Sequence, residues 1–596
     1  MSTKNFTKLF TVILLVAAFI YGCSKSFLTT SPVGTLDPNT LADEKGVNKV
    51  LIGAYALLDN YDPGIEFNQF GASASNSLFA EIGGGVANKG SDLSDQGGIY
   101  SPVERHETDP LNVGCYDQWN VDYEGIKRTN NVLNLLAKVE VISDENKTNI
   151  QGQARFLRAY YHFLLRIIFK NVPYIDEVTS AQLDAGTIKS VPNKDEIFPK
   201  ILEDAKFAYE NLPASQDAVG RINKWCAGAF YGKVLLYTKD YATARTVLND
   251  VVDNGVNPLG VKYDLNASFA DNFDVDHDNN MESVFAFQAS AQDNAGAGNT
   301  NWGDVLNTPP NAGGGAGFYT PTYFFVNRFK TDAAGLPVAN PNDNALMDLY
   351  GQGGAGYTQY AGNVDPRLDW TVGRNGIPYY DWGVVDHTWV RTDVGGSEPW
   401  SSGPFEPKKG SIKQSQIDKA HDGSIWFQGG GTSLNVNLIR FSDVLLMTAE
   451  AETMDAGGNL AKATALVNRV RNRAVSTPRV KTYVDNSNPS AGFTNTDAAA
   501  YKVAPYPADF ASQDAAMKAI QLERLLELGM EGFRFFDLVR WGIADSEMNA
   551  FYSYEAAIPY AKLLRTPTTA VYNSPGDDYY PVPQKAIDLS GGILTP

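Results

Sequence analysis

Cysteine, histidine and positive charge are scarce in this chain. Three cysteines and five histidines in 596 residues exclude a disulfide-rich scaffold, and no HExxH-like zinc spacing occurs. The 49 Lys and Arg face 68 Asp and Glu, for a formal net charge of −19. This deficit argues against nucleic acid and anionic lipid as partners, because both need a basic surface. The sequence leaves open whether Cys115 and Cys226 pair, and favours two buried free thiols.

Long hydrophobic runs are also rare, and the clearest one lies at the N-terminus. Lys4 and Lys8 precede an apolar segment at residues 9–20. That segment is too short for a bilayer span, which needs roughly 20 residues. The pattern therefore predicts a signal peptide over residues 1–22.

A cysteine follows this segment directly. Ile20, Gly22 and Cys23 form a pattern that resembles a bacterial lipobox, which implies that Cys23 is lipidated and becomes the mature N-terminus. Residues 23–39 contain two prolines and predict a flexible tether. We therefore expect a lipid-anchored protein.

Apolar, aromatic and glycine residues are well represented. Hydrophobic residues make up 43% and charged residues 20%, which is typical of a folded globular protein. Thirty Tyr, thirty Phe and 54 Gly accompany the acidic balance. This combination suits an extracellular binding protein.

Apolar residues recur at helical spacing in two blocks, at about 40–254 and 438–542. Small residues such as Ala242 and Ala244 make the 224–254 pair similar to a tetratricopeptide hairpin, in which helices approach closely. The fold class predicted is mainly α, with few short strands. Predicted helices cover 116–139, 150–175 (capped near Ser143 and ended by Pro173), 195–212, 224–238, 241–254, and 440–474 with a break at 457–458.

Three sections lack helical periodicity, and one of them, residues 476–509, is predicted to be loop. Residues 67–110, rich in Gly, Ser and Asn, predict an extended loop. Residues 255–437 predict a long irregular section that holds most of the tryptophans, with one alternating stretch at 281–289 typical of a strand.

Residues 521–542 combine apolar, aromatic and charged side chains at close spacing. Charges such as Glu527 and Arg540 among so many aromatics predict paired carboxylates and guanidiniums, because a buried unpaired charge is costly. An acid/base site is the functional alternative, and a structural ion-pair network is favoured.

Five stretches combine charged and apolar residues in distinctive patterns: ARFLRAYYHF (154–163), DPRL (365–368), RFSDVLLMTAEA (440–451), ERLLELGMEGFRFFDLVRWG (523–542) and YYPVPQKA (579–586). They lie in both helical blocks, in the second half of the irregular section, and at the C-terminus. Together they resemble signatures of the SusD/RagB family of nutrient-binding surface lipoproteins.

This resemblance implies one SusD-like domain over residues 40–596, with 255–437 as its ligand section. It implies a non-catalytic protein on the outer face of an outer membrane that binds oligosaccharide or another nutrient, without a cofactor. Its implied partner is a SusC-like TonB-dependent transporter barrel. A surface glycoside hydrolase and a tetratricopeptide-type protein-interaction scaffold remain alternatives.

Aromatic residues of the irregular section are the candidates for ligand contact. An indole can stack on the C–H face of a sugar while Asn and Asp bind the hydroxyls. Trp302 and Trp382 are predicted to be exposed, whereas the helical Trp119, Trp225 and Trp541 are assigned to the core. The full candidate set is Trp302, Asp304, Tyr319, Tyr379, Tyr380, Trp382, Trp389 and Trp400.

Other chemical motifs are weak. Asp274, Asp276 and Asp278 begin like a calcium loop, but Asn279 replaces the expected glycine and Phe285 the bidentate Glu. An acidic turn is therefore favoured. No GxSxG motif is present, and the identity of the ligand stays open.

Overall fold

The computed structural model describes residues 41–61, 70–92, 95–343, 349–350, 357–386, 388–389, 405–425, 428–558 and 570–596. Their secondary structure is mainly helical with short strands, which confirms the predicted class. None of the helices in these ranges is both long enough and apolar enough to cross a membrane. Cys23 and the tether lie outside the described residues.

The N-terminal helices pack on one another largely in chain order. Their ends are close to the predicted ones, and Ser143 accepts the Asn146 N–H at 3.2 Å to cap its helix as expected. The helices are α3 (Glu44–Tyr55), α5 (Val113–Leu136), α6 (Asp144–Phe169), α7 (Glu177–Asp184), α8 (Phe198–Asn211), α9 (Lys224–Tyr237) and α10 (Tyr241–Asn254).

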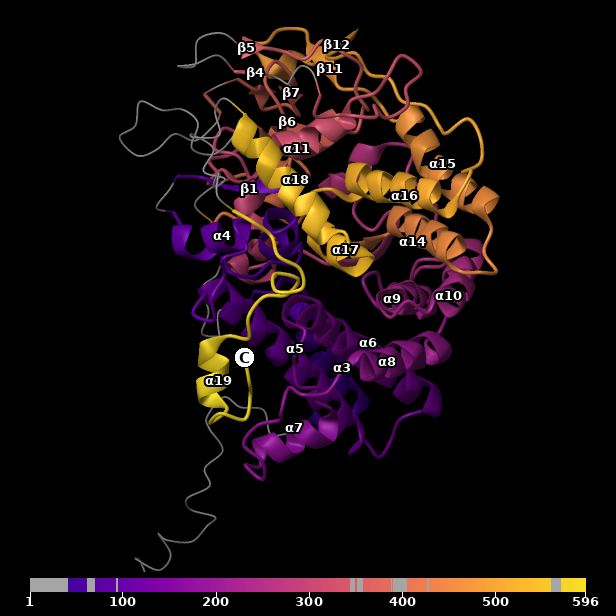
Figure 1. The fold of residues 1–596 in the computed structure, drawn as a ribbon. Helices are drawn as coiled ribbons and strands as arrows, with labels where there is room; N and C mark the ends of the chain where they lie inside the picture. Colours follow the sequence, from indigo (N-terminus) through magenta and orange to yellow (C-terminus); the bar gives the residue numbers. More distant parts are fainter. Residues whose placement is uncertain are drawn as a thin grey trace, which may run out of the picture.

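The two helical blocks form one continuous platform. The chain leaves the first block after α10 and returns as α14 (Phe441–Met454), which packs directly on α10. α15 (Leu460–Ser476) and α16 (Gln513–Leu528) then pack on α14. Figure 1 shows α8, α9, α10, α14 and α15 following one another along one side of the molecule.

A small residue sets the spacing between α9 and α10. A Cβ added at Gly232 would lie 2.4 Å from the Leu248 side chain, so a larger residue would force the two helices apart. This close approach agrees with the predicted tetratricopeptide-like hairpin. The end of α6 was misplaced by the sequence pattern: Lys170, with φ 63°, stops the helix before Pro173.

An antiparallel pair of strands connects the early part of the irregular section with its end. β2 (Ser283–Phe287), the predicted strand, pairs with β10 (Val436–Arg440). The other two-stranded sheets are β1 (Ala87–Gly90) with β3 (Phe318–Pro321), β4 (Leu349–Tyr350) with β5 (Tyr357–Thr358), β6 (Val372–Gly373) with β9 (Glu406–Pro407), β7 (Pro378–Tyr379) with β8 (Gly383–Val384), and β11 (Lys481–Tyr483) with β12 (Phe493–Asp497). Short helices are α11 (Tyr323–Val326), α12 (Leu368–Thr371) and α13 (Ile417–Ala420).

The extended loop predicted at 67–110 is wrong for its described residues. Residues 71–92 are buried and contain a π-helical turn at Ser77–Ile82 and strand β1, and α4 (Gly97–Glu104) follows. The Glu81 carboxylate accepts the N–H groups of Met530, at 3.2 Å, and of Gly532. A side chain at Gly84 or Gly85 would clash with Phe535 or Phe551, so these two glycines permit close packing against the C-terminal part of the chain.

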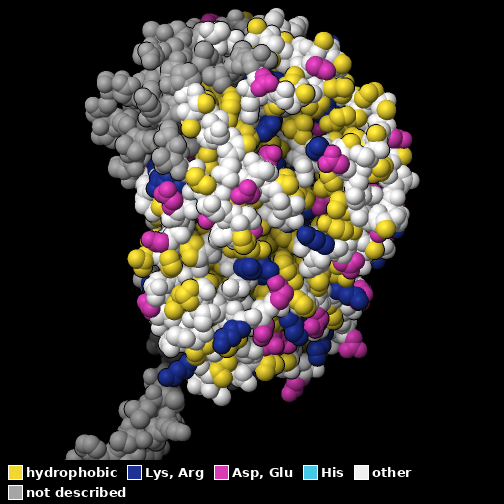
Figure 2. All heavy atoms as spheres, in the orientation of Figure 1, with side chains coloured by type: hydrophobic (Ala, Val, Ile, Leu, Met, Phe, Trp, Pro, Cys, Tyr) yellow, Lys and Arg dark blue, Asp and Glu magenta, His cyan; other side chains and the backbone are white. Residues whose placement is uncertain are grey.

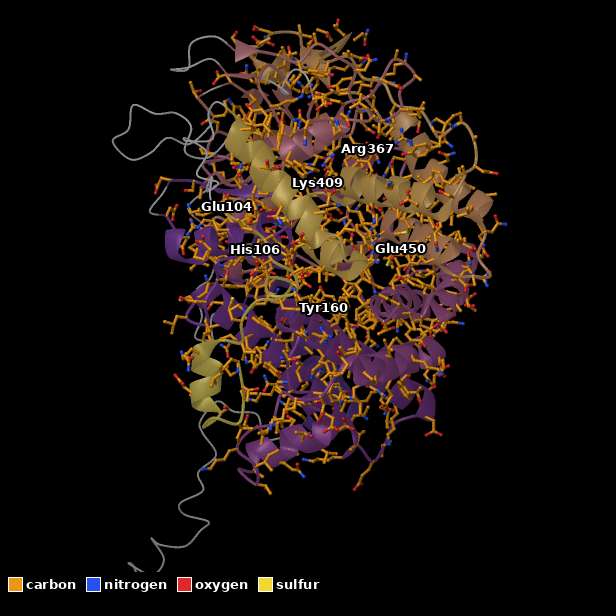
Figure 3. All side chains as sticks on the ribbon, in the orientation of Figure 1. Glu104, His106, Tyr160, Arg367, Lys409 and Glu450 are labelled. Atoms are coloured by element: carbon orange, nitrogen blue, oxygen red, sulfur yellow. The ribbon has the colours of Figure 1, made fainter. Side chains whose placement is uncertain are left out.

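The charges of residues 521–542 form a buried ion-pair network, as favoured from the sequence. Arg367 contacts Asp365 at 2.8 Å, Glu523 at 2.7 Å and Glu527 at 2.9 Å. Arg440 also contacts Glu527, at 3.0 Å. Arg367 is fully buried, and Figure 3 labels it next to α16. The network ties the irregular section and α14 to α16.

Three helices complete the C-terminal part: α17 (Arg534–Trp541), α18 (Ala544–Ala557) and α19 (Gln584–Leu589). On the face shown in Figure 2, basic and acidic side chains are interspersed, so the acidic excess is not gathered into one patch there. Cys115 and Cys226 are buried free thiols, as favoured from the sequence.

Candidate functional site

The predicted ligand residues fall into two separate groups. Trp302, in the turn Trp302–Asn307, and Tyr319, in β3, join the main hydrophobic core. Asp304 lies in the same turn as Trp302 and is a buried polar residue. A second hydrophobic cluster contains the others that the structure describes. We call it the aromatic cluster and define it as Trp370, Tyr379, Tyr380, Trp382 and Trp389.

Burial contradicts the predicted exposure of Trp302. Its side chain is 4% exposed, and its ring lies 5.6 Å from Tyr61 and 6.4 Å from Phe70. Tyr319 is buried as well, with its hydroxyl 3.2 Å from that of Tyr100. These rings fill the junction between the irregular section and the N-terminal block, which sequence spacing could not reveal.

Asp304 lies beside a small polar cavity. It accepts hydrogen bonds from the Ser75 hydroxyl and N–H and, at 3.1 Å, from the Asn307 amide. Burial raises the pKa of Asp304 to about 6, although the bonds from Ser75 oppose the shift. The cavity also meets Lys409 and Glu531 and measures about 50 Å³. That volume admits water but is below the roughly 300 Å³ of a typical ligand site.

Lys409 fastens one wall of this cavity to the C-terminal stretch. Its ammonium donates to Glu531 at 2.6 Å and to the carbonyls of Glu527 and Gly529 at 3.0 and 2.8 Å. Figure 3 labels Lys409 inside the molecule, near α18. The cavity is therefore a rigid structural feature, and Asp304 shapes it through Ser75 and Asn307.

The aromatic cluster forms where β7 and β8 pack on the chain after β9. The Tyr379 hydroxyl donates to the Pro407 carbonyl at 2.6 Å, and the Tyr380 hydroxyl donates to the Lys408 carbonyl at 3.1 Å. The Trp382 indole N–H donates to the Ile412 carbonyl at 2.9 Å. These bonds hold each ring in a defined orientation.

A buried lysine lies against the same rings. The Lys408 ammonium is 4.8 Å from the ring centre of Tyr380, 5.3 Å from Tyr379 and 5.5 Å from Trp370. Burial lowers the pKa of Lys408 to about 7, although Asp369 opposes the shift. The lysine donates to the Asp369 and Pro378 carbonyls at 2.7 and 3.1 Å, so it braces the cluster from within.

The cluster is only partly shielded from solvent. Tyr379 and Trp389 are buried and Tyr380 nearly so, so these three rings expose little surface on which a sugar could stack. Trp370 and Trp382 are half-buried. Trp382 thus keeps part of the exposure that was predicted for it, whereas Trp400 lies outside the described residues.

Sequence reasoning missed two residues beside this cluster. Trp370, of α12, was not a candidate, and Phe493 lay in a stretch assigned to loop. Phe493 is 49% exposed and stacks on Tyr483 at 5.0 Å. The Tyr483 hydroxyl donates to the Tyr380 carbonyl at 2.7 Å, which joins the β11–β12 hairpin to the cluster. Alternation of aromatic residues with Thr in that hairpin was the available signal.

Two of the three tryptophans that were assigned to the core, Trp119 and Trp225, are buried as predicted. Trp541 is half-buried, with the Arg540 guanidinium 4.8 Å from its ring, because α17 lies at the edge of the platform.

Two of the three aspartates of the calcium-like sequence are engaged by basic side chains, and Asp278 instead accepts the Asn435 N–H at 3.3 Å. Asp274 contacts Lys413 at 2.5 Å, and Asp276 pairs with Lys419. The Gln416 amide donates to both carboxylates. This arrangement fits the acidic turn that was favoured, with its charge offset by the segment around α13.

Two family models match this helical platform with its irregular section. One is described as the SusD family and matches residues 281–595, just over half of the chain. The other is described as "starch-binding associating with outer membrane" and matches residues 27–236. The chain therefore belongs to the SusD family.

Named relatives share this family at low identity. The SusD-like protein P25 of Formosa agariphila is 21% identical over 548 residues, which cover 89% of this chain and 90% of that protein. A SusD-like protein of Bacteroides ovatus is 25% identical over 295 residues, covering 46% of this chain and 49% of the relative. The matched region thus spans about half of the second relative.

Solved structures show the same fold. A laminarin-binding SusD-like protein superposes with a TM-score of 0.62 at 21% identity, covering 93% of this chain and 98% of that one. Surface glycan-binding protein A of Bacteroides thetaiotaomicron, in complex with laminarihexaose, gives a TM-score of 0.61 at 19% identity, with 92% and 98% covered.

Proposed function

We propose that this protein binds an oligosaccharide or polysaccharide at the cell surface without cleaving it. The observation that carries the proposal is the aromatic cluster, in which Trp370 and Trp382 keep part of their rings open to solvent. Their indole N–H groups bond to the carbonyls of Pro478 and Ile412. The rings are therefore pre-oriented, and a sugar can stack on them with little loss of side-chain entropy. Membership of the SusD family supports this assignment.

Affinity electrophoresis through gels that contain laminarin, starch or another polysaccharide tests the proposal. The wild-type protein is expected to be retarded by at least one glycan. Trp382→Ala should weaken binding by about 1–3 kcal/mol, the range for a lost stacking contact. Trp541→Ala is the matched control, because it removes a half-buried indole on α17, outside the cluster.

Equal retardation of the wild type and of the Trp370→Ala and Trp382→Ala variants would exclude the cluster as the site. Release of reducing sugar from the retarding glycan would instead support a surface glycoside hydrolase. A protein that no glycan retards, but that binds other proteins, would support the scaffold alternative.

We further propose that Cys23 anchors the protein in the outer membrane by lipid, with 23–39 as its tether and 40–596 as its domain. The support is the lipobox-like sequence and the family description that names outer-membrane association. Cys23→Ala should move the protein from the membrane fraction to the soluble fraction. Continued fractionation with membranes would contradict the lipid anchor.

Delivery to a SusC-like TonB-dependent transporter is the last part of the proposal. A lipid anchor enters one leaflet only, so a bound glycan needs a separate channel to cross the membrane. Affinity purification of a C-terminally tagged form in mild detergent should recover a barrel protein in near-stoichiometric amount. Recovery of the tagged protein alone, with ligand present, would leave a free-standing surface binder.

A further inference from the structure

A cavity of about 330 Å³ lies between α16, α17, α18 and the loop at 337–341, away from the aromatic cluster. Figure 1 shows these three helices meeting on the viewed face. The volume falls within the range of small-molecule sites. No role has been given to this cavity so far.

Among the residues that line this cavity, the basic side chains outnumber the acidic ones. Arg534 opens α17 and contacts the Glu547 carboxylate of α18 at 2.9 Å, while Arg328 reaches the same carboxylate at 3.9 Å. The side chains of Arg534 and Arg328 are only 9% and 20% exposed. Among the described residues, two desolvated guanidiniums thus share one carboxylate.

The arrangement differs from the pairing of other buried arginines in this chain. Arg540 contacts both Glu450 and Asp537, and Arg166 makes two bonds to Glu196. Burial lowers the pKa of Arg328 and Arg534, and Glu547 offsets only part of that shift. A second negative charge near the pair would therefore be stabilised.

The remaining lining is suited to an organic ligand. Pro337, Val338, Leu522, Leu525 and Ile543 supply apolar walls. Lys518 adds a further positive charge at the rim, where it pairs with the exposed Asp514 at 2.9 Å. Guanidinium forks match the oxygens of carboxylate and sulfate groups, and the apolar walls can face a ring.

We propose that this cavity binds a compact organic oxyanion, a sugar or similar ring that bears a carboxylate or sulfate group. The anionic group would lie between Arg328 and Arg534, opposite Glu547. The site is separate from the aromatic cluster, so it stands even if the cluster binds no glycan.

Calorimetric titration with four probes tests the proposal: glucuronate, glucose 6-sulfate, glucose and sodium sulfate. The two anionic sugars are expected to bind and to raise the melting temperature, glucose to do neither, and sulfate to bind at least fivefold more weakly than one of them. The arms also distinguish a carboxylate ligand from a sulfated one. Failure of both anionic sugars, or equal binding of glucose or of sulfate, would overturn the proposal.

Substitutions of residues that line the cavity test whether the ligand binds there. Arg328→Met should weaken the binding of the preferred anionic sugar about tenfold, and Glu547→Gln should strengthen it severalfold, because it removes the competing carboxylate. Arg469→Met is the matched control: Arg469 is exposed and pairs with Asp264 outside the cavity. Weaker binding in Glu547→Gln, with a melting temperature showing folded protein, or unchanged binding in Arg328→Met, would overturn the assignment.

Discussion

The guanidinium of Arg367 beside α16 and those of Arg328 and Arg534 beside α18 are all mostly removed from water but differ in their counter-charges. Arg367 contacts three carboxylates, whereas Arg328 and Arg534 share Glu547. Burial alone would lower the pKa of Arg367, yet its carboxylates hold that pKa well above the usual range. The pKa values of Arg328 and Arg534 are instead lowered by burial. The first region therefore stabilises the fold, and the second keeps charge available for a ligand.

Removing a cation from the first region should produce the largest effect. Arg367→Met leaves Asp365, Glu523 and Glu527 facing one another in a buried site, and breaking such a network costs about 3–5 kcal/mol. Urea denaturation measures the loss of unfolding free energy. Lys200→Met, which removes an exposed partner of Glu203, is a control for a smaller electrostatic contribution.

If Arg367→Met lowers the unfolding free energy by less than about 1 kcal/mol, the network contributes little to stability. The two regions would then not differ in their effect on stability.

Glu555 is a buried carboxyl group for which the described residues supply a backbone N–H and no guanidinium, so it tests how burial acts on a charge without a counter-charge. Burial raises the pKa of Glu555 to about 8, although the Phe324 N–H, which donates to it at 2.8 Å, opposes the shift. The raised pKa stabilises the fold at low pH, and this contribution is lost as pH rises from about 4.5 through 8. Each pH unit within that window costs about 1.4 kcal/mol.

Thermal or urea unfolding at pH 6 and pH 8 measures this effect. Wild type should lose about 2–3 kcal/mol relative to Glu555→Gln over that interval, because the variant cannot ionise there. Parallel pH dependence of the two proteins would contradict the raised pKa. Use of the difference removes the contributions of other titrating groups such as Lys408.

Removing a cation from the second region should have the smallest effect on stability. Arg328→Met replaces an under-paired guanidinium by an apolar chain of similar length, and Arg534 keeps Glu547. We expect a change within about 1 kcal/mol of wild type, of either sign. A loss as large as that of Arg367→Met would show that Arg328 is structural, which would remove the contrast between the regions.

Much of the helical platform was predictable, because local patterns specify it. The apolar periodicity, the cap at Ser143 and the small residues Ala242 and Ala244 of the 224–254 pair each act within one helix or one hairpin. The ion-pair network was also predictable in kind, since charges next to Phe535 and Trp541 require partners. Its partners Asp365 and Glu282, the latter 2.6 Å from Arg440, were not predictable, because they come from distant segments that only folding brings together.

The candidate ligand residues were predicted less well. Composition pointed to the aromatic residues of 255–437, but composition does not report solvent exposure. Trp302 turned inward at the junction with 71–92, whereas Phe493 turned outward in a hairpin that had been assigned to loop. Exposure depends on which segments pack over a ring, and such contacts connect residues far apart in the chain.

Short motifs and periodicities in the sequence encode the family, the helical platform and the acidic, aromatic character. Which aromatic rings face solvent, and which guanidiniums have their full set of carboxylates, depends on the folded structure, because burial and charge pairing are properties of three-dimensional neighbours. Arg328 and Glu547 lie outside every signature stretch, and together with Arg534 they become a site only where η8 (Asn327–Phe329), α17 and α18 meet.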